Sequence, residues 1–67
     1  MLNIQLNGEP LQFDSTKDLA SLVEAQGVRQ TQVALVLNGE LVPRHRWAHI
    51  HIQDNDNLEL FSAVAGG

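Results

Sequence analysis

Two Asn-Gly dipeptides, at residues 7–8 and 38–39, constrain the fold of this chain more than any other feature. Asn-Gly is typical of a two-residue hairpin turn because both residues tolerate the positive φ that such turns require. Apolar and polar residues alternate over 2–6 before the first pair and over 11–13 after it, as in half-buried strands. The second pair ends the apolar run 33–37, which is typical of a strand covered on both faces. The sequence therefore predicts two hairpins.

A helix is expected between the hairpins. Three apolar residues recur at helical spacing on one face: Leu19, Leu22 and Val23. Ser15 or Thr16 is expected to cap the start of this helix, which would place Asp18 in its first turn. Gly27 supplies a C-terminal stop.

After the second hairpin, Pro43 ends its return strand, and a last strand over 58–61 leads into residues 64–67. The order ββαββ predicts an α+β domain with a small mixed sheet and one main helix packed on one face. This is the order of the β-grasp, or ubiquitin-like, fold, and we expect residues 1–67 to form a single such domain. The crossover through the helix is expected to place the next strand parallel to the first, with the final strand central.

Strand alternation also predicts an apolar patch on the outer face of the sheet. If Leu58 and Leu60 face the helix, Phe61 and Ala63 face away from it, and so does Val36. Apolar patches often mark interaction surfaces, so Phe61, Val36 and Ala63 are candidates for docking a partner. Scattered surface apolar residues are equally consistent with the pattern.

The composition excludes several classes of function. The chain has no cysteine, so thiolate catalysis, disulfides and cysteine-based metal sites are absent. No glycine-rich phosphate loop and no recognisable nucleophile arrangement occur, and we expect a protein that is not itself an enzyme. The net charge of −4 argues against nucleic-acid binding. The sequence contains no membrane-spanning run and no signal-peptide pattern, so we expect a cytoplasmic protein.

A histidine cluster is the one group that resembles a metal site. His45 and His49 stand four residues apart, and His51 follows. The zincin pattern requires a glutamate directly after the first histidine, and this chain has Arg46 there. We therefore expect no metal site, although a histidine-based metal carrier remains an alternative.

The sequence ends with Gly66-Gly67, and this feature points most directly to a function. Glycine has no Cβ, so such a segment can enter a narrow active site on another protein. We expect a flexible tail over 64–67 in which Gly67 carries the reacting carboxylate. Gly66, Ala65 and Val64 would thread that carboxylate into a partner.

The chain resembles the ThiS sulfur carriers of thiamine biosynthesis, within the ThiS/MoaD ubiquitin-like family. The resemblance runs end to end, and its most specific parts are the Asn-Gly-x-x-Val-Pro-Arg-x-x-Trp segment over 38–47 and the final diglycine. One departure is Asn55, where the family usually has glycine. Asparagine meets the same backbone need in a turn.

The resemblance implies a carrier that partner enzymes modify. A ThiF-type adenylyltransferase would use ATP to adenylate Gly67, and a persulfide donor would convert it to a thiocarboxylate. A ThiG-type thiazole synthase would accept the sulfur, and the carrier itself would bind no cofactor. The small subunit of molybdopterin synthase shares this chemistry and is one alternative. A ubiquitin-like binding module with an inert tail is another.

Overall fold

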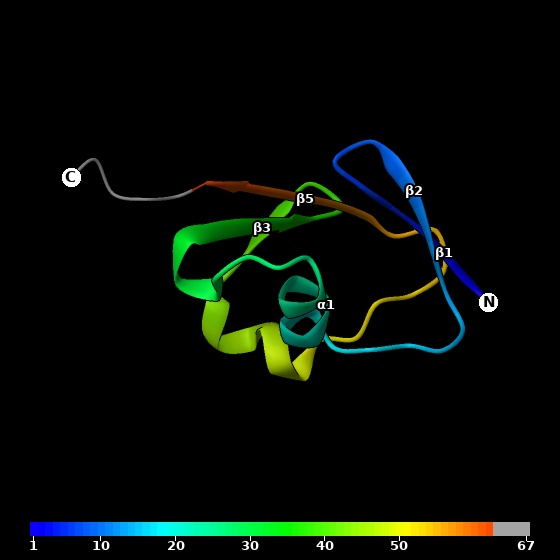
Figure 1. The fold of residues 1–67 in the computed structure, drawn as a ribbon, viewed down its shortest axis with the longest axis horizontal. Helices are drawn as coiled ribbons and strands as arrows, with labels where there is room; N and C mark the ends of the chain where they lie inside the picture. Colours follow the sequence, from blue (N-terminus) through cyan, green and yellow to red (C-terminus); the bar gives the residue numbers. More distant parts are fainter. Residues whose placement is uncertain (63–67) are drawn as a thin grey trace.

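The computed structural model describes residues 1–62, which form five strands, one α-helix and two 3₁₀ helices (Figure 1). In chain order the elements are β1 (Leu2–Leu6), β2 (Glu9–Phe13), α1 (Leu19–Ala25), η1 (Gln30–Gln32), β3 (Val33–Leu37), β4 (Glu40–Val42), η2 (Arg44–His49) and β5 (Asn57–Ser62). The predicted ββαββ order is confirmed. The predicted tail over 64–67, and Ala63 before it, lie outside the described residues.

The five strands make one mixed sheet in the order β2-β1-β5-β3-β4, so β5 is central as predicted. β5 runs parallel to β1 and antiparallel to β3. The expectation that β3 is parallel to β1 is therefore wrong. The helical crossover connects β2 to β3, and β2 already runs antiparallel to β1, so β3 shares the direction of β2.

Both Asn-Gly pairs form the predicted tight turns. Asn7 and Gly8 have φ of 53° and 82°, and Asn38 and Gly39 have φ of 51° and 87°. Leu6 pairs with Glu9 and Leu37 with Glu40, so only two residues lie in each loop. Positive φ at both loop residues matches the twist of the flanking strands.

The start of α1 differs from the prediction, because Asp18 rather than Ser15 or Thr16 caps the helix. Its carboxylate accepts hydrogen bonds from the Ser21 backbone N–H at 3.0 Å and from the Ser21 hydroxyl at 2.8 Å. Thr16 Oγ1 instead donates to the carbonyl oxygen of Ile52 at 2.7 Å. The Thr16 hydroxyl therefore does not cap α1 but connects the loop before the helix to Ile52, which is distant in sequence.

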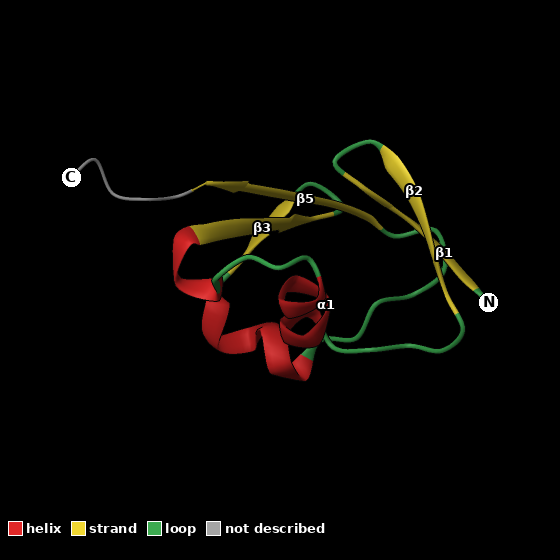
Figure 2. Cartoon of the chain, viewed as in Figure 1, coloured by secondary structure: helices red, strands yellow, loops and turns green. Residues whose placement is uncertain are grey.

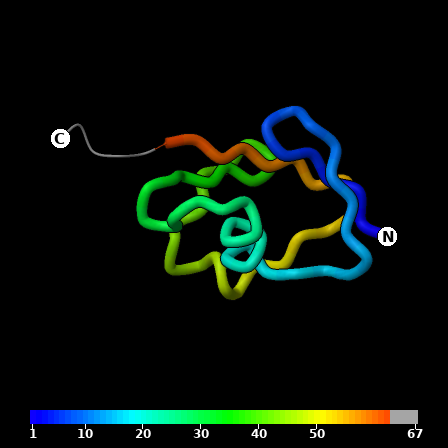
Figure 3. The backbone as a smooth tube through the Cα atoms, viewed as in Figure 1, coloured from blue at the N-terminus to red at the C-terminus, as the bar shows by residue number. Residues whose placement is uncertain are grey.

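The core lies between the sheet and α1, with η2 on the same side (Figures 2 and 3). Ten buried side chains form one cluster: Ile4, Leu6, Leu19, Leu22, Val23, Leu35, Val42, Trp47, Ile52 and Leu58. β3 is covered on one face only, contrary to the prediction from its apolar run. Leu35 alone in this strand is fully buried, whereas Ala34 and Val36 are half-buried on the opposite face.

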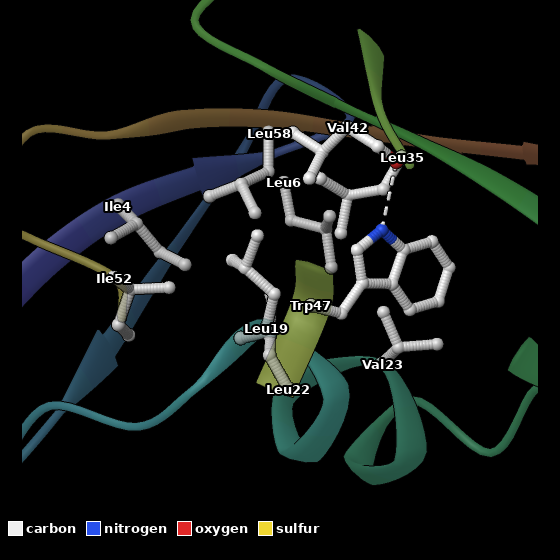
Figure 4. Packing of buried hydrophobic residues seen from close by; sticks show 10 residues of the cluster. All are labelled: Ile4, Leu6, Leu19, Leu22, Val23, Leu35, Val42, Trp47, Ile52 and Leu58. Atoms are coloured by element: carbon white, nitrogen blue, oxygen red, sulfur yellow. Dashed lines mark hydrogen bonds between the residues drawn. The ribbon is translucent and has the colours of Figure 1, made fainter. Parts of the chain in front are cut away.

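Trp47 connects η2 to the sheet. Its indole is 1% exposed and packs among core side chains from α1, β3 and β4, as Figure 4 shows. The indole Nε1 donates a hydrogen bond to the carbonyl oxygen of Val42 at 2.9 Å. Trp47, the largest side chain of the core, is thus buried with its one polar atom, the indole Nε1, hydrogen-bonded.

Trp47→Phe should lower the free energy of unfolding by about 1–3 kcal/mol, because it removes the indole hydrogen bond to the Val42 carbonyl and reduces the ring volume in the core. Urea unfolding followed by far-ultraviolet circular dichroism measures this change. Leu41→Ala is the control, since Leu41 is 66% exposed and should change stability little. Equal midpoints for Trp47→Phe and the wild type would contradict the assigned role.

The hydrogen bonds from the Ser21 hydroxyl and backbone N–H lower the pKa of Asp18 below its ordinary value, and nearby His51 contributes in the same direction. A lowered folded-state pKa gives stability that is present above the unfolded pKa and lost as pH falls through the folded pKa. In the Asp18→Asn variant the asparagine would still cap the helix but would not titrate. As the pH falls from the unfolded-state pKa of Asp18 through its lowered folded-state pKa, the wild type should therefore lose more free energy of unfolding than Asp18→Asn does. Urea unfolding at a series of acidic pH values measures this difference. Unfolding midpoints that fall in parallel for both proteins would contradict the prediction.

Candidate functional site

The apolar part of the outer sheet face is the leading candidate for a functional surface. Across the strands, Phe61 pairs with Ala34, and Leu41 pairs with Val36. Phe61 is 49% exposed and Leu41 is 66% exposed. Ala34 and Val36 are half-buried between them. We call these four residues the outer patch.

The part of the same face over β1 and β2 is mostly polar. On β1 and β2, Asn3 pairs with Gln12 and Gln5 with Pro10, all exposed. Gln12 Nε2 also donates to Asn3 Oδ1 at 2.8 Å. The outer face is therefore divided, and its apolar half lies over β3, β4 and the C-terminal half of β5.

The structure places two of the three predicted docking residues together. Phe61 and Val36 both belong to the outer patch, whereas Ala63 lies outside the described residues. Sequence reasoning missed Leu41 and Ala34. The turn at 38–39 contained the signal, because a two-residue loop that pairs Leu37 with Glu40 also pairs Val36 with Leu41.

Residues 63–67, which include the predicted reactive Gly67, follow directly on β5. Hydrogen bonds hold this strand firmly at its start. The Asn57 N–H donates to Asn38 Oδ1 at 2.9 Å, and the Asn57 carbonyl accepts from the Asn38 N–H at 2.8 Å. On the other edge, the carbonyl of Leu58 accepts from the Asn7 N–H at 2.9 Å. The start of β5, the central strand that precedes the predicted tail, is thus bonded on both edges.

Asn7 extends this pairing with its side chain. Its Oδ1 accepts a hydrogen bond from the Leu60 N–H at 2.9 Å, across 53 residues of sequence. Because β1 ends at Leu6, no further backbone of β1 is available to Leu60. The turn residue therefore adds one more hydrogen bond to β5 beyond the end of its neighbour.

The histidines do not form a common site. His45, His49 and His51 are exposed, and the first two lie in η2, a 3₁₀ helix. In such a helix residues three apart share a face, so a spacing of four separates the side chains. Within residues 1–62, no group of three His, Cys, Asp or Glu residues is arranged to hold a metal ion.

The two aspartates of the loop before β5 have structural partners. Asp54 Oδ1 accepts from the Asn3 N–H at 2.8 Å, and Asp56 Oδ2 accepts from the Gln53 N–H at 2.8 Å. Asn55 lies between them with φ of 74°, the left-handed geometry expected from the sequence. The Asp54 contact connects the loop to β1, the Asp56 contact lies within the loop, and both support a structural role for these carboxylates.

Within the part of the chain that the structure describes, no helix is long and apolar enough to span a membrane.

Comparison with known proteins is consistent with this arrangement. The model of the ThiS family matches residues 4–67. The sulfur carrier protein ThiS of Escherichia coli is 35% identical over 66 residues, covering 98% of this chain and 100% of that protein. The crystal structure of the thiamine biosynthesis protein ThiS from Geobacter metallireducens superposes with a TM-score of 0.84 at 29% identity, covering 98% of this chain and 100% of that one.

A longer protein also contains a similar segment. The thiazole synthase of Paramagnetospirillum magneticum is 30% identical over 66 residues, which cover 98% of this chain but 20% of that protein. The structural match to ThiS confirms the predicted β-grasp fold.

Proposed function

The chain belongs to the ThiS family of sulfur carriers in thiamine biosynthesis, and on this basis we propose that Gly67 carries the sulfur as a thiocarboxylate. The observation that carries the proposal is that the ThiS family match extends through Gly66-Gly67. The chain also has no cysteine that could hold sulfur. Sulfur held by such a protein needs another attachment point, and a C-terminal carboxyl group supplies one.

The proposed reaction has two stages, both in partner enzymes. The Gly67 carboxylate attacks the α-phosphate of ATP in a ThiF-type adenylyltransferase, so pyrophosphate leaves and an acyl-adenylate forms. The terminal sulfur of a donor persulfide then attacks the acyl carbon and AMP leaves. A thiol reductant cleaves the resulting S–S bond and leaves the thiocarboxylate on Gly67. The need for ATP favours a cytoplasmic location.

The position of the predicted tail in the sequence, directly after β5, supports a reaction that takes place in partner enzymes. Residues 63–67 follow a strand that β3 pairs as far as Ser62 and β1 pairs as far as Leu58, so the domain offers a base from which a partner can receive the last residues. Gly66 and Gly67 add no side chains that would obstruct a narrow channel. The partners would provide the groups that stabilise the charge developed in each step.

We place docking of these partners on the outer patch. An aromatic side chain such as Phe61, half exposed within an apolar surface, is typical of residues that anchor an interface. A ThiG-type thiazole synthase is the expected sulfur acceptor. That a thiazole synthase contains a segment similar to this chain supports direct contact between the two proteins.

The central test is the intact mass of the chain after incubation with ATP, a ThiF-type enzyme and a persulfide donor. The expected shift corresponds to replacement of one carboxyl oxygen by sulfur. Gly66→Val should fold normally but block this shift, because the added side chain obstructs entry of the tail. Gly66→Ala, with a smaller side chain, is the matched variant and should be less impaired. No shift in the wild type with an enzyme of proven competence would overturn the proposal.

Phe61→Ala should weaken binding to the thiazole synthase by roughly 2 kcal/mol, or about thirty-fold in Kd, because the variant truncates an interface anchor. Gln5→Ala on the polar half of the same face is the matched control and should bind normally. Isothermal titration calorimetry measures both. Equal losses for the two variants would show that docking does not depend on the outer patch.

A further inference from the structure

The C-terminal half of β5 has an open edge. In this strand, alternate residues direct their backbone groups to β1 and to β3. Leu58 and Leu60 bond toward the β1 side, so the Leu60 carbonyl and the Ser62 N–H point to the same side. β1 pairs with β5 only as far as Leu58, and the Asn7 side chain reaches only the Leu60 N–H. Within residues 1–62, no hydrogen bond reaches the Leu60 carbonyl or the Ser62 N–H.

A groove of about 620 Å³ lies beside this open edge. It is bounded by the end of β1, by the segment that leaves α1 and by β5. The apolar side chains that line it include Leu6, Val28, Val33 and Leu60. Val28, which follows the end of α1, is 39% exposed here.

The groove also has a charge preference. Among the described residues that line it, Arg29 is the one that carries a charge, and its side chain is exposed. The protein as a whole has a net charge of −4, so a positive group at this position contrasts with its surroundings. An acidic side chain on a ligand would complement it.

We propose that an extended segment of the thiazole synthase adds to the open edge of β5 as a short sixth strand. Its backbone would donate to the Leu60 carbonyl and accept from the Ser62 N–H. One of its apolar side chains would enter the groove, and an acidic side chain would face Arg29. Phe61 lines the groove and also belongs to the outer patch, so the added strand would continue the docking surface described above. This inference rests on the proposed function and specifies how the partner holds the base of the tail.

Ser62→Pro tests the main-chain contact selectively. Proline removes the N–H that faces the open edge, whereas the pairing of β5 with β3 uses the groups of Phe61 rather than those of Ser62. Ser62→Ala keeps the N–H and is the matched control. We expect Ser62→Pro to weaken thiazole synthase binding by roughly ten-fold and Ser62→Ala to bind within about two-fold of wild type.

A matched pair of variants tests the proposed contact between Arg29 and an acidic side chain of the thiazole synthase. Arg29→Glu should weaken binding several-fold at low salt, and the loss should diminish as ionic strength rises. Arg46→Glu makes the same change of charge outside the groove and should have a smaller effect. Equal effects of the two variants would overturn the acidic contact to Arg29.

Amide hydrogen exchange gives a readout that needs no variant. In the complex, the Ser62 N–H should exchange at least about ten-fold more slowly than in the free protein, because it becomes a strand donor. Unchanged exchange at Ser62 in a formed complex, or equal affinities of Ser62→Pro and Ser62→Ala, would overturn the added strand. Slowing with the ThiF-type enzyme but not with the thiazole synthase would overturn the choice of partner. If the wild type bound neither enzyme, the proposed function itself would fail.

Discussion

The pairing of β5 with two different neighbours is the interaction on which the rest of this structure depends. β1 at the start of the chain and β3 in its middle pair with the same strand, one in parallel and one antiparallel. Within residues 1–62, β5 is the strand that lies between the two hairpins and joins them into one sheet. Burial of Leu58 and Leu35 on the same side then places the core beneath this junction. The strand that unites the sheet is also the one that leads to the proposed reactive residue.

The division of the two sheet faces follows from the small size of the domain. One helix and one short 3₁₀ helix cover the inner face, and Trp47 fills the space that α1 alone would leave. Nothing in the described chain covers the outer face, so apolar residues on β3, β4 and β5 stay accessible. Their accessibility costs hydrophobic stabilisation that burial would provide, which is understandable if a partner covers them during function.

A carrier of this kind needs surfaces more than catalytic groups. The protein's chemistry is proposed to reside in one carboxyl group, and its recognition by partners is proposed to use the outer patch and the open edge of β5. The two surfaces meet at Phe61, immediately before the end of the described chain. A partner that binds both would hold the base of the tail from two sides, and this would direct Gly67 toward its active site.

Much of the fold could be predicted because its signals are local. The Asn-Gly pairs specify both hairpins through the φ values that their two residues tolerate, and the two-residue loop sets the register that pairs Val36 with Leu41. Alternation along each strand then separates Leu58 from Phe61 on opposite faces. The sequence by itself also determined the family, through the 38–47 segment and the final diglycine.

The tertiary structure alone decided which polar groups meet across long stretches of chain. Thr16 bonds to Ile52 rather than capping α1, so Asp18 takes the capping position. Asn7 reaches Leu60, and the edge beyond it stays open because β1 ends too early to cover it. A turn asparagine looks the same in sequence whether or not its side chain finds a partner 53 residues away. Such contacts depend on the relative placement of whole elements, which local propensity and periodicity do not encode.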